Sequence, residues 1–148
     1  MTKFLATQTG QKLAYSFTKG TGPTVVFLGG FKSDMEGSKA IFLEKWAKKR
    51  NRSFLRFDYS GHGQSSGDFL NLGIGDWCND AKQIIGLTEN NGIILVGSSM
   101  GGWIALLLSR ELGSRLKGLI TIAAAPDFTE ESMWKNFTED QKKEVLNK

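Results

Sequence analysis

A serine lies at the centre of a glycine-bounded motif in the second half of the chain. Residues 97–101 read Gly-Ser-Ser-Met-Gly and fit the pattern G-x-S-x-G, with Ser99 in the middle position. Apolar residues 93–96 precede the motif and apolar residues 103–108 follow it, as expected for a strand, a turn and a helix. A serine on such a turn exposes its oxygen, and the helix N-terminus favours the negative charge that develops during attack on a carbonyl. We therefore predict that Ser99 is a catalytic nucleophile.

The residues on either side of Ser99 are also those that a catalytic serine turn requires. A side chain at Gly97 or Gly101 would collide with nearby backbone or with the adjacent strand. The amide of Met100, at the start of the helix, is the expected first donor of an oxyanion hole. The alternative is a glycine-rich helix N-terminus in which a serine only caps the helix. A second glycine, Gly102, favours the nucleophile, because glycines cost helix stability and so indicate close packing.

A second pair of glycines follows an earlier apolar segment. Gly29, Gly30 and Phe31 come directly after residues 24–28, Thr-Val-Val-Phe-Leu. A serine hydrolase of this type takes its second oxyanion donor from the loop at this point, and glycines let the backbone approach the substrate carbonyl. We predict that the Phe31 amide is this donor. A plain strand-to-helix turn is the alternative.

The chain has one histidine, His62, in the glycine-rich segment 58–65. A triad histidine must reach the serine oxygen and be oriented by a carboxylate, and in this fold the chain order is serine, acid, histidine. Because His62 precedes Ser99, we predict that it packs in the glycine-rich turn and is not the base. Asp127 could orient a histidine, but a loop or helix N-terminal role is favoured.

Several other functions are excluded by composition. No phosphate-binding loop or dinucleotide fingerprint is present, and one cysteine with one histidine cannot make an ordinary zinc site, so we expect no cofactor and no metal. The net charge is only +4, and the basic cluster within residues 45–52 is predicted to be a solvated helix end and not a nucleic-acid surface. A single cysteine, no leader-like segment and no apolar run of about 20 residues predict a cytoplasmic protein without a membrane span.

The elements that must position these residues alternate along the chain. Alternating side chains predict a hairpin, and apolar runs predict buried strands; these strands are residues 3–7, 12–17, 24–28, 53–58, 92–96 and 116–124. Helical spacing of apolar residues predicts the helices 33–50, 74–85 and 103–112, the first with Ala40, Leu43, Trp46 and Ala47 on its buried face. Residues 20–23 are predicted to be a turn and residues 59–71 a loop. This pattern predicts an α/β fold: a mostly parallel sheet with helices on both faces and reactive groups at the carboxyl ends of its strands.

Three segments resemble a known family: residues 54–61, Phe-Leu-Arg-Phe-Asp-Tyr-Ser-Gly; residues 75–77, Gly-Asp-Trp; and residues 94–103 around Ser99. They are similar to the α/β-hydrolase superfamily, in the branch of mitochondrial acyl-protein thioesterases and mycophenolic acid acyl-glucuronide esterases. Residues 30–31 and 37–40 resemble its oxyanion-loop region. The resemblance implies a serine esterase or thioesterase that forms an acyl-enzyme on Ser99 and uses no cofactor. Its substrates would be small-molecule or acyl-protein esters or thioesters.

The resemblance also implies parts that the 148 residues do not contain. The family continues into a cap, two further strands, a catalytic aspartate and a catalytic histidine. Residues 1–128 are therefore predicted to be the N-terminal part of an α/β-hydrolase core without the C-terminal strands, and residues 129–148 the start of the cap. We expect such a truncated chain to be weakly active or inactive and to self-associate through its exposed sheet edge. The alternatives are a non-catalytic hydrolase-like binding domain and a degenerate fragment.

Overall fold

A six-stranded sheet brings together segments that lie far apart in the sequence. The computed structural model describes residues 1–88, 91–126, 135–136 and 138–146. The strands follow the spatial order β1-β2-β4-β3-β5-β6. Their bounds are β1 (Lys3–Ala6), β2 (Lys12–Thr18), β3 (Thr21–Leu28), β4 (Arg52–Phe57), β5 (Ile93–Ser98) and β6 (Leu116–Ile122).

The sheet is mixed but mostly parallel. The hairpin of β1 and β2 is antiparallel, with Lys3 opposite Tyr15, and β2 also pairs antiparallel with β4. The strands β4, β3, β5 and β6 are parallel neighbours. Because parallel strands end at the same edge of a sheet, the loops after β3, β4 and β5 meet there. The predicted fold class is confirmed.

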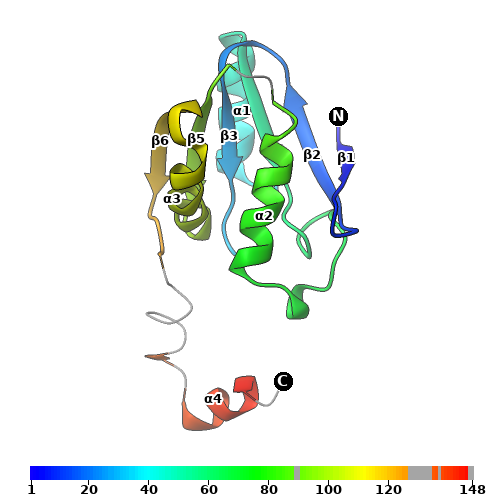
Figure 1. The fold of residues 1–148 in the computed structure, drawn as a ribbon, viewed down its shortest axis with the longest axis vertical. Helices are drawn as coiled ribbons and strands as arrows, with labels where there is room; N and C mark the ends of the chain where they lie inside the picture. Colours follow the sequence, from blue (N-terminus) through cyan, green and yellow to red (C-terminus); the bar gives the residue numbers. More distant parts are fainter. Residues whose placement is uncertain (89–90, 127–134, 137, 147–148) are drawn as a thin grey trace.

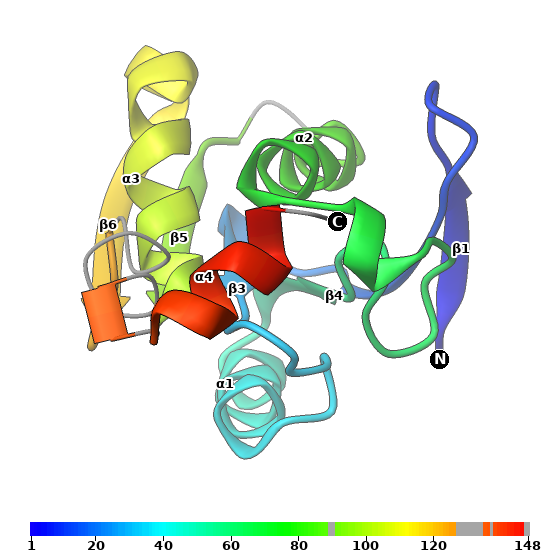
Figure 2. The same ribbon diagram turned by 90° about the horizontal axis from the view of Figure 1, so that it is seen from below.

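Helices cover both faces of this sheet. One face is covered by α1 (Ser38–Lys49), and the other by α2 (Ile74–Ile85) and α3 (Met100–Leu112) (Figure 1). Figure 2, seen from below, shows α1 on one side of the strands and α2 and α3 on the opposite side. The last helix, α4 (Glu139–Leu146), lies apart from the sheet. Short 3₁₀ turns at Phe69–Asn71 and Gly113–Arg115 join the larger elements.

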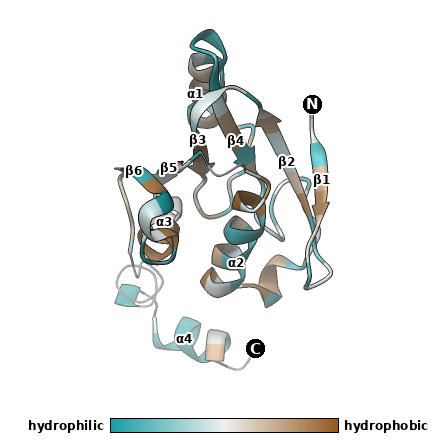
Figure 3. Cartoon of the chain, turned by 45° about the horizontal axis from the view of Figure 1, so that its top comes forward, coloured by the Kyte–Doolittle hydropathy of each residue, from teal (hydrophilic) through white to brown (hydrophobic). Residues whose placement is uncertain are grey.

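The core lies mainly between the sheet and the helices α2 and α3. The central strands are hydrophobic, while teal, hydrophilic stretches are prominent on the helices (Figure 3). A smaller buried cluster lies under α1, composed of Val25, Phe27, Ala40, Ala47, Phe54 and Val96. The central strands are therefore buried on both faces, which explains why they read as continuous apolar runs.

The start of β3 differs from the sequence prediction. Residues 20–23 were expected to form a turn, but the strand begins at Thr21, whose amide donates to the Asn51 carbonyl at 2.7 Å. The register between β3 and β4 shifts between Thr21 and Val25. Pro23 lies in this irregular stretch, where the missing proline amide costs no regular ladder bond.

The first helix is shorter than predicted, and its predicted buried face is confirmed except at Trp46: Ala40 and Ala47 are buried and Leu43 packs beside them. It begins at Ser38 and not at residue 33, and Trp46 is 37% exposed, with the Arg50 guanidinium 5.2 Å above its ring. Glu44 is buried instead, because Arg56 on β4 bonds its carboxylate. Apolar spacing could not reveal this charged pair.

The last strand has the apolar sequence of a buried strand but is the exposed edge that we expect in the truncated chain. Strand β6 ends at Ile122 and is mostly exposed; Ile120 is 54% exposed. Within the described residues β6 pairs with β5 only, so its outer edge is open. The predicted boundary at residues 128 and 129, and Asp127, lie outside the described residues.

Candidate functional site

Ser99 lies between β5 and α3 in a strained backbone conformation. Its φ is +55° and its ψ is −118°, a backbone conformation that residues other than glycine rarely adopt. Such strain persists only where the surroundings impose it, and it is typical of the serine turn in hydrolases. The side chain of Ser99 is exposed, whereas the neighbouring Met100 is fully buried.

Backbone hydrogen bonds to β6 and α3 impose this conformation. The Ser99 amide donates to the Ile122 carbonyl at 2.9 Å. The Ser99 carbonyl accepts from the amides of Gly102 at 2.9 Å and Ala125 at 3.2 Å. Because the backbone of Ser99 is occupied in this way, its hydroxymethyl group is the part that faces outward.

The glycines on either side of the serine allow very close backbone packing. A Cβ atom at Gly97 would overlap the carbonyl of Gly101, and a Cβ atom at Gly101 would overlap the carbonyl of Leu28. One at Gly102 would lie 2.7 Å from the Cβ atom of Ala124. The collisions that the sequence analysis predicted are therefore present, and they bring the end of β3 against the start of α3.

The loop after β3 lies directly beside the serine. A Cβ atom built on Gly30 would be 3.6 Å from the Ser99 Cβ atom and 3.7 Å from the Ser98 carbonyl oxygen. The Phe31 ring packs against Phe69 and Trp77, with centroids 5.2 and 5.9 Å away. Met100 begins α3, and amides in the first turn of a helix have no acceptor within that helix. The predicted oxyanion residues thus belong to segments that the fold places around Ser99.

Side chains from the end of β4 fix the start of this β3–α1 loop (residues 29–37), a feature that the sequence analysis missed. The Tyr59 hydroxyl donates to the Gly29 carbonyl at 3.0 Å. The Lys32 amide donates to His62 Nε2 at 3.1 Å. Because β4 is the parallel neighbour of β3, the residues that follow it reach the loop after β3.

The same segment fixes the later part of the loop at Met35. The Met35 amide donates to Asp58 Oδ1 at 2.7 Å, and its carbonyl accepts from Arg56 Nη1 at 3.0 Å. Burial raises the pKa of the Asp58 carboxyl, although amide hydrogen bonds from Gln64 and Met35 act in the opposite direction. A polar residue straight after a buried strand was the available signal for this role.

His62 packs inside the turn and does not reach toward the serine as a base. Its imidazole is 4% exposed and lies edge-on to Tyr59 and Trp77. Its Nδ1 atom lies 3.0 Å from the Ser60 carbonyl, and its Nε2 atom accepts from Lys32. The prediction that His62 packs in the glycine-rich turn is confirmed.

A buried ion pair supports the loop from behind. Arg56 Nε bonds Glu44 Oε2 at 2.7 Å, and Arg56 Nη1 bonds the exposed Glu36 at 3.0 Å. Burial by itself raises the pKa of Glu44, but hydrogen bonds from Arg56 and Lys48 outweigh it and lower that pKa. A lowered folded-state pKa gives stability that is present above the unfolded value and is lost as the pH falls through the folded value.

Replacing Arg56 by methionine is expected to destabilise the fold by about 3 kcal/mol, because Glu44 then stays buried without its one buried cationic partner and keeps only the more exposed Lys48. Urea unfolding followed by tryptophan fluorescence measures this loss. The matched control, Glu36→Gln, removes only the half-exposed partner and is expected to cost about 0–1 kcal/mol. Equal losses of unfolding free energy in the two variants would show that the buried Arg56–Glu44 pair stabilises the fold no more than the exposed Arg56–Glu36 pair.

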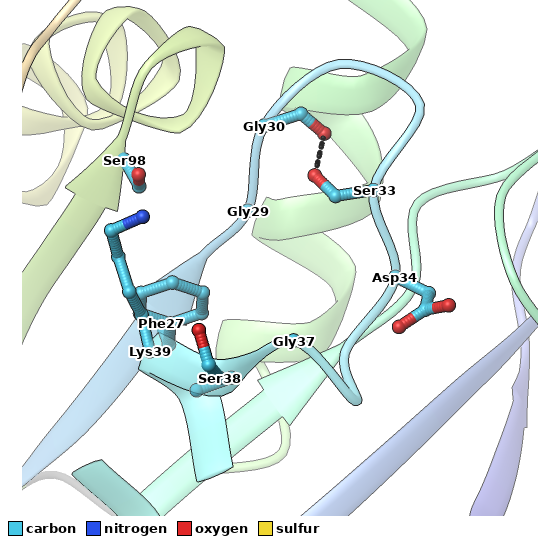
Figure 4. A pocket seen from close by; sticks show the side chains of 10 residues that line it. Phe27, Gly29, Gly30, Ser33, Asp34, Gly37, Ser38, Lys39 and Ser98 are labelled. Atoms are coloured by element: carbon cyan, nitrogen blue, oxygen red, sulfur yellow. Dashed lines mark hydrogen bonds between the residues drawn. The ribbon is translucent and has the colours of Figure 1, made fainter. Parts of the chain in front are cut away.

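A small cavity opens beside Ser98 and Gly30. Its volume is about 160 Å³, and its lining includes Ser38 and Lys39 from the start of α1 (Figure 4). In the figure the Lys39 amine and the Ser98 hydroxyl point toward one another, while the Ser33 hydroxyl donates to the Gly30 carbonyl. The cavity beside Ser98 therefore combines hydroxyl and amine groups with apolar side chains such as Phe27.

We also searched the described residues for a candidate metal site and for a second reactive nucleophile. Within them, no three His, Cys, Asp or Glu side chains are grouped so that they could hold a metal ion. Cys78 is buried, and burial raises the pKa of its thiol. Over the same residues, no helix is both long and apolar enough to cross a bilayer. Ser99 is the exposed nucleophile candidate that the fold places on a strained turn.

A mostly parallel sheet of this strand order, with helices on both faces, defines an α/β-hydrolase-type fold. Residues 21–147 match the serine aminopeptidase S33 family (Hydrolase_4), and the chain belongs to this family. Rat palmitoyl-protein thioesterase ABHD10, mitochondrial, is 39% identical over 115 residues, which cover 78% of this chain and 39% of that protein. The human protein of the same name is 38% identical over 115 residues, covering 78% of this chain and 38% of its own length. The chain thus spans about two fifths of the length of these curated relatives.

Solved structures agree with this assignment. Mouse alpha/beta hydrolase domain-containing protein 10 superposes with a TM-score of 0.90 and 34% identity, covering 99% of this chain and 59% of that one. A hydrolase from Agrobacterium vitis also gives a TM-score of 0.90, with 33% identity, covering 99% of this chain and 60% of its own. The hydrolase fold expected from the sequence resemblance is confirmed.

Proposed function

We propose that this chain carries the nucleophile and the oxyanion hole of a serine hydrolase that cleaves carboxylic esters or thioesters. The strained backbone of Ser99 is the observation that carries the proposal. It places an exposed hydroxyl at a helix N-terminus, beside a glycine loop, at the carboxyl edge of a parallel sheet. A serine that only capped a helix would not need a positive φ angle.

In the proposed reaction, Ser99 Oγ attacks the acyl carbon while its proton passes to a general base. The amides of Phe31 and Met100 donate to the carbonyl oxygen, which becomes negative in the tetrahedral intermediate. The intermediate collapses with loss of the alcohol or thiol, which takes up the proton. Water then cleaves the acyl-enzyme and releases the acid. Gly29 and Gly30 let the loop approach the oxyanion, and Gly97 and Gly101 let the serine turn form.

The relatives suggest a substrate class. Because the similar mammalian proteins are named palmitoyl-protein thioesterases, we propose small-molecule or acyl-protein esters or thioesters as substrates, and no nucleic-acid partner. The Met100 side chain is fully buried in the core, so only its backbone amide is available to the site. We also propose a cytoplasmic location, although the mammalian relatives are named mitochondrial; microscopy of the tagged protein distinguishes the two.

A fluorophosphonate probe tests the proposed nucleophile. In this and every later labelling experiment free imidazole is present as the general base, because residues 1–148 offer no free imidazole of their own. We expect the probe to modify Ser99, as mapped by peptide mass spectrometry, at least about tenfold faster than it modifies any residue of the Ser99→Ala variant. Ser98→Ala is the matched control, because it removes the neighbouring hydroxyl and keeps Ser99. Labelling that survives Ser99→Ala, or no labelling of the unmodified chain, would favour a hydrolase-like binding domain instead.

The open edge of β6 predicts self-association. Ile120 and Ile122 are exposed on this strand, which pairs on one side only within the described residues. Unpaired strand edges with apolar side chains pair with other chains. We expect sedimentation velocity to show dimers or larger species, and Ile120→Lys to restore the monomer. A monomer at concentrations of about 100 μM, in the range where exposed edges associate, would contradict this prediction.

A further inference from the structure

We propose that His62 is a positioning residue: its imidazole accepts a hydrogen bond from the Lys32 amide and so holds the strained turn in which the Phe31 amide faces the oxyanion. This inference rests on the proposed function, since it concerns the loop that would hold the oxyanion. The acyl-transfer steps themselves do not use His62. The structure nevertheless gives both of its ring nitrogens a backbone partner.

The hydrogen bonds identify the protonation state that the loop requires. A backbone amide can only donate, so the bond from Lys32 requires a lone pair on His62 Nε2. The ring proton must then be on Nδ1, where it is donated to the Ser60 carbonyl at 3.0 Å. An imidazolium carries a proton on both nitrogens. It would direct an N–H group at the Lys32 amide, and that contact would become repulsive.

The loop needs this contact because its backbone is strained at the same place. Lys32 has a φ of +59°, which is unusual for a residue with a side chain. The tight turn is closed by the Ser33 amide and hydroxyl, which both donate to the Gly30 carbonyl, at 3.2 and 2.7 Å. The Lys32 amide shares its peptide plane with the Phe31 carbonyl, and this plane is joined at the Phe31 Cα atom to the one that carries the Phe31 amide. When the Lys32 amide is released, the turn can relax and the Phe31 amide can rotate away from the oxyanion position.

The groups packed against His62 fix the ring in a closed setting. Aromatic rings surround it: Tyr59 after β4, Phe69 from the 3₁₀ turn, and Trp77 from α2. The Trp77 indole also donates to the Ser60 carbonyl at 3.0 Å, so this acceptor is fixed from two sides. With the ring and its Nδ1 partner fixed, a change at Nε2 is transmitted to Lys32.

Two charged groups face this aromatic cluster. The Asp80 carboxylate, from α2, accepts from the Ser60 amide and hydroxyl at 2.7 and 2.6 Å, and it interacts electrostatically with His62. The Lys32 ammonium lies over the rings of Phe31 and Phe69, at 5.7 and 5.5 Å from their centroids. The charged or titratable groups that face the cluster are therefore His62, Asp80 and Lys32. Variants at His62 alone isolate the effect of His62 on the modification of Ser99.

Two substitutions separate the hydrogen bond from the packing. His62→Phe keeps an aromatic ring among Tyr59, Phe69 and Trp77 but has no acceptor for Lys32. His62→Gln supplies an amide that accepts and donates as neutral imidazole does, and it does not titrate. Thermal unfolding of each variant first establishes that it folds.

The readout is the rate of fluorophosphonate modification of Ser99, resolved into the limiting rate and the half-saturating probe concentration. We expect His62→Phe to lower the limiting rate by about tenfold or more, with little change in half-saturation, as for a lost oxyanion donor. We expect His62→Gln to restore most of the limiting rate that His62→Phe loses, because its side-chain amide again accepts from Lys32. Equal limiting rates for His62→Phe and the unmodified chain, or a limiting rate for His62→Gln as low as that for His62→Phe, would overturn the inference.

Hydrogen exchange of the Lys32 amide gives an independent answer. We expect this amide to be protected at neutral pH in the unmodified chain and in His62→Gln, and to lose protection in His62→Phe. Absence of any Ser99 modification in the unmodified chain would contradict the proposed function. The hydrogen-exchange result would then decide by itself whether His62 positions the Lys32 amide. An unprotected Lys32 amide in the unmodified chain would overturn the inference whatever the probe shows.

Discussion

Gly101→Ala is expected to remove most of the stability of this fold. The added Cβ atom would overlap the Leu28 carbonyl and lie 2.7 Å from the Gly29 carbonyl oxygen. Both neighbours are backbone atoms, at the junction of β3 with its loop, so neither can move without breaking the sheet. We expect a loss of about 4 kcal/mol or more, a large share of the roughly 5–15 kcal/mol typical of a domain. Urea unfolding monitored by tryptophan fluorescence measures it.

A glycine elsewhere in a helix provides the control. Gly75 lies in the first turn of α2, and a Cβ atom there would meet no atom within 4 Å. Gly75→Ala is expected to change stability by less than about 1 kcal/mol, in the stabilising direction. If Gly101→Ala unfolds at the same urea concentration as Gly75→Ala, the close approach of β3 and α3 is not as the structure describes it. That approach also places Gly30 beside Ser99, so the fold and the site depend on the same contact.

The sequence predicts those parts of the fold that depend on local spacing. Alternation gives the first hairpin, apolar runs give the central strands, and helical spacing gives α2 within its observed bounds. The motif around Ser99 is likewise local, and so its turn could be placed. Predictions failed where a distant partner decides the outcome: Pro23 is accommodated by a register shift against β4, and Glu44 is buried because Arg56 lies opposite.

The contacts that fix the β3–α1 loop were beyond the sequence for a related reason. Asp58, Tyr59 and His62 each bond the backbone of a residue between 23 and 30 positions away. Any residue type can supply a backbone amide or carbonyl, so nothing in the sequence of residues 29–35 indicates that these hydrogen bonds form. Only the parallel pairing of β3 with β4 shows that two glycine-rich loops meet. The composition of β6 is that of a buried strand, and its exposure follows from its place at the edge of the sheet among the described residues.

A polypeptide of residues 1–148 is expected to turn over esters about 10⁴- to 10⁶-fold more slowly than a complete serine hydrolase, the range observed when a triad member is lost. Its only histidine is His62, and both ring nitrogens of His62 already bond backbone groups. No imidazole in these residues is therefore available to take the proton from Ser99. Hydrolysis of p-nitrophenyl butyrate, measured beside full-length mouse ABHD10, tests this expectation.

A base supplied from solution distinguishes a missing base from a defective nucleophile. Free imidazole should raise hydrolysis by the polypeptide above that by its Ser99→Ala variant, because the proposed site has its serine and its amide donors and lacks only a proton acceptor. The Ser99→Ala reaction subtracts hydrolysis by imidazole itself. Turnover within about tenfold of a complete enzyme without imidazole would show that another group activates Ser99. No imidazole effect, with Ser99 still modified by the phosphonate, would instead place the defect in binding the ester. The two results together therefore separate the chemistry of the nucleophile from the recognition of its substrate.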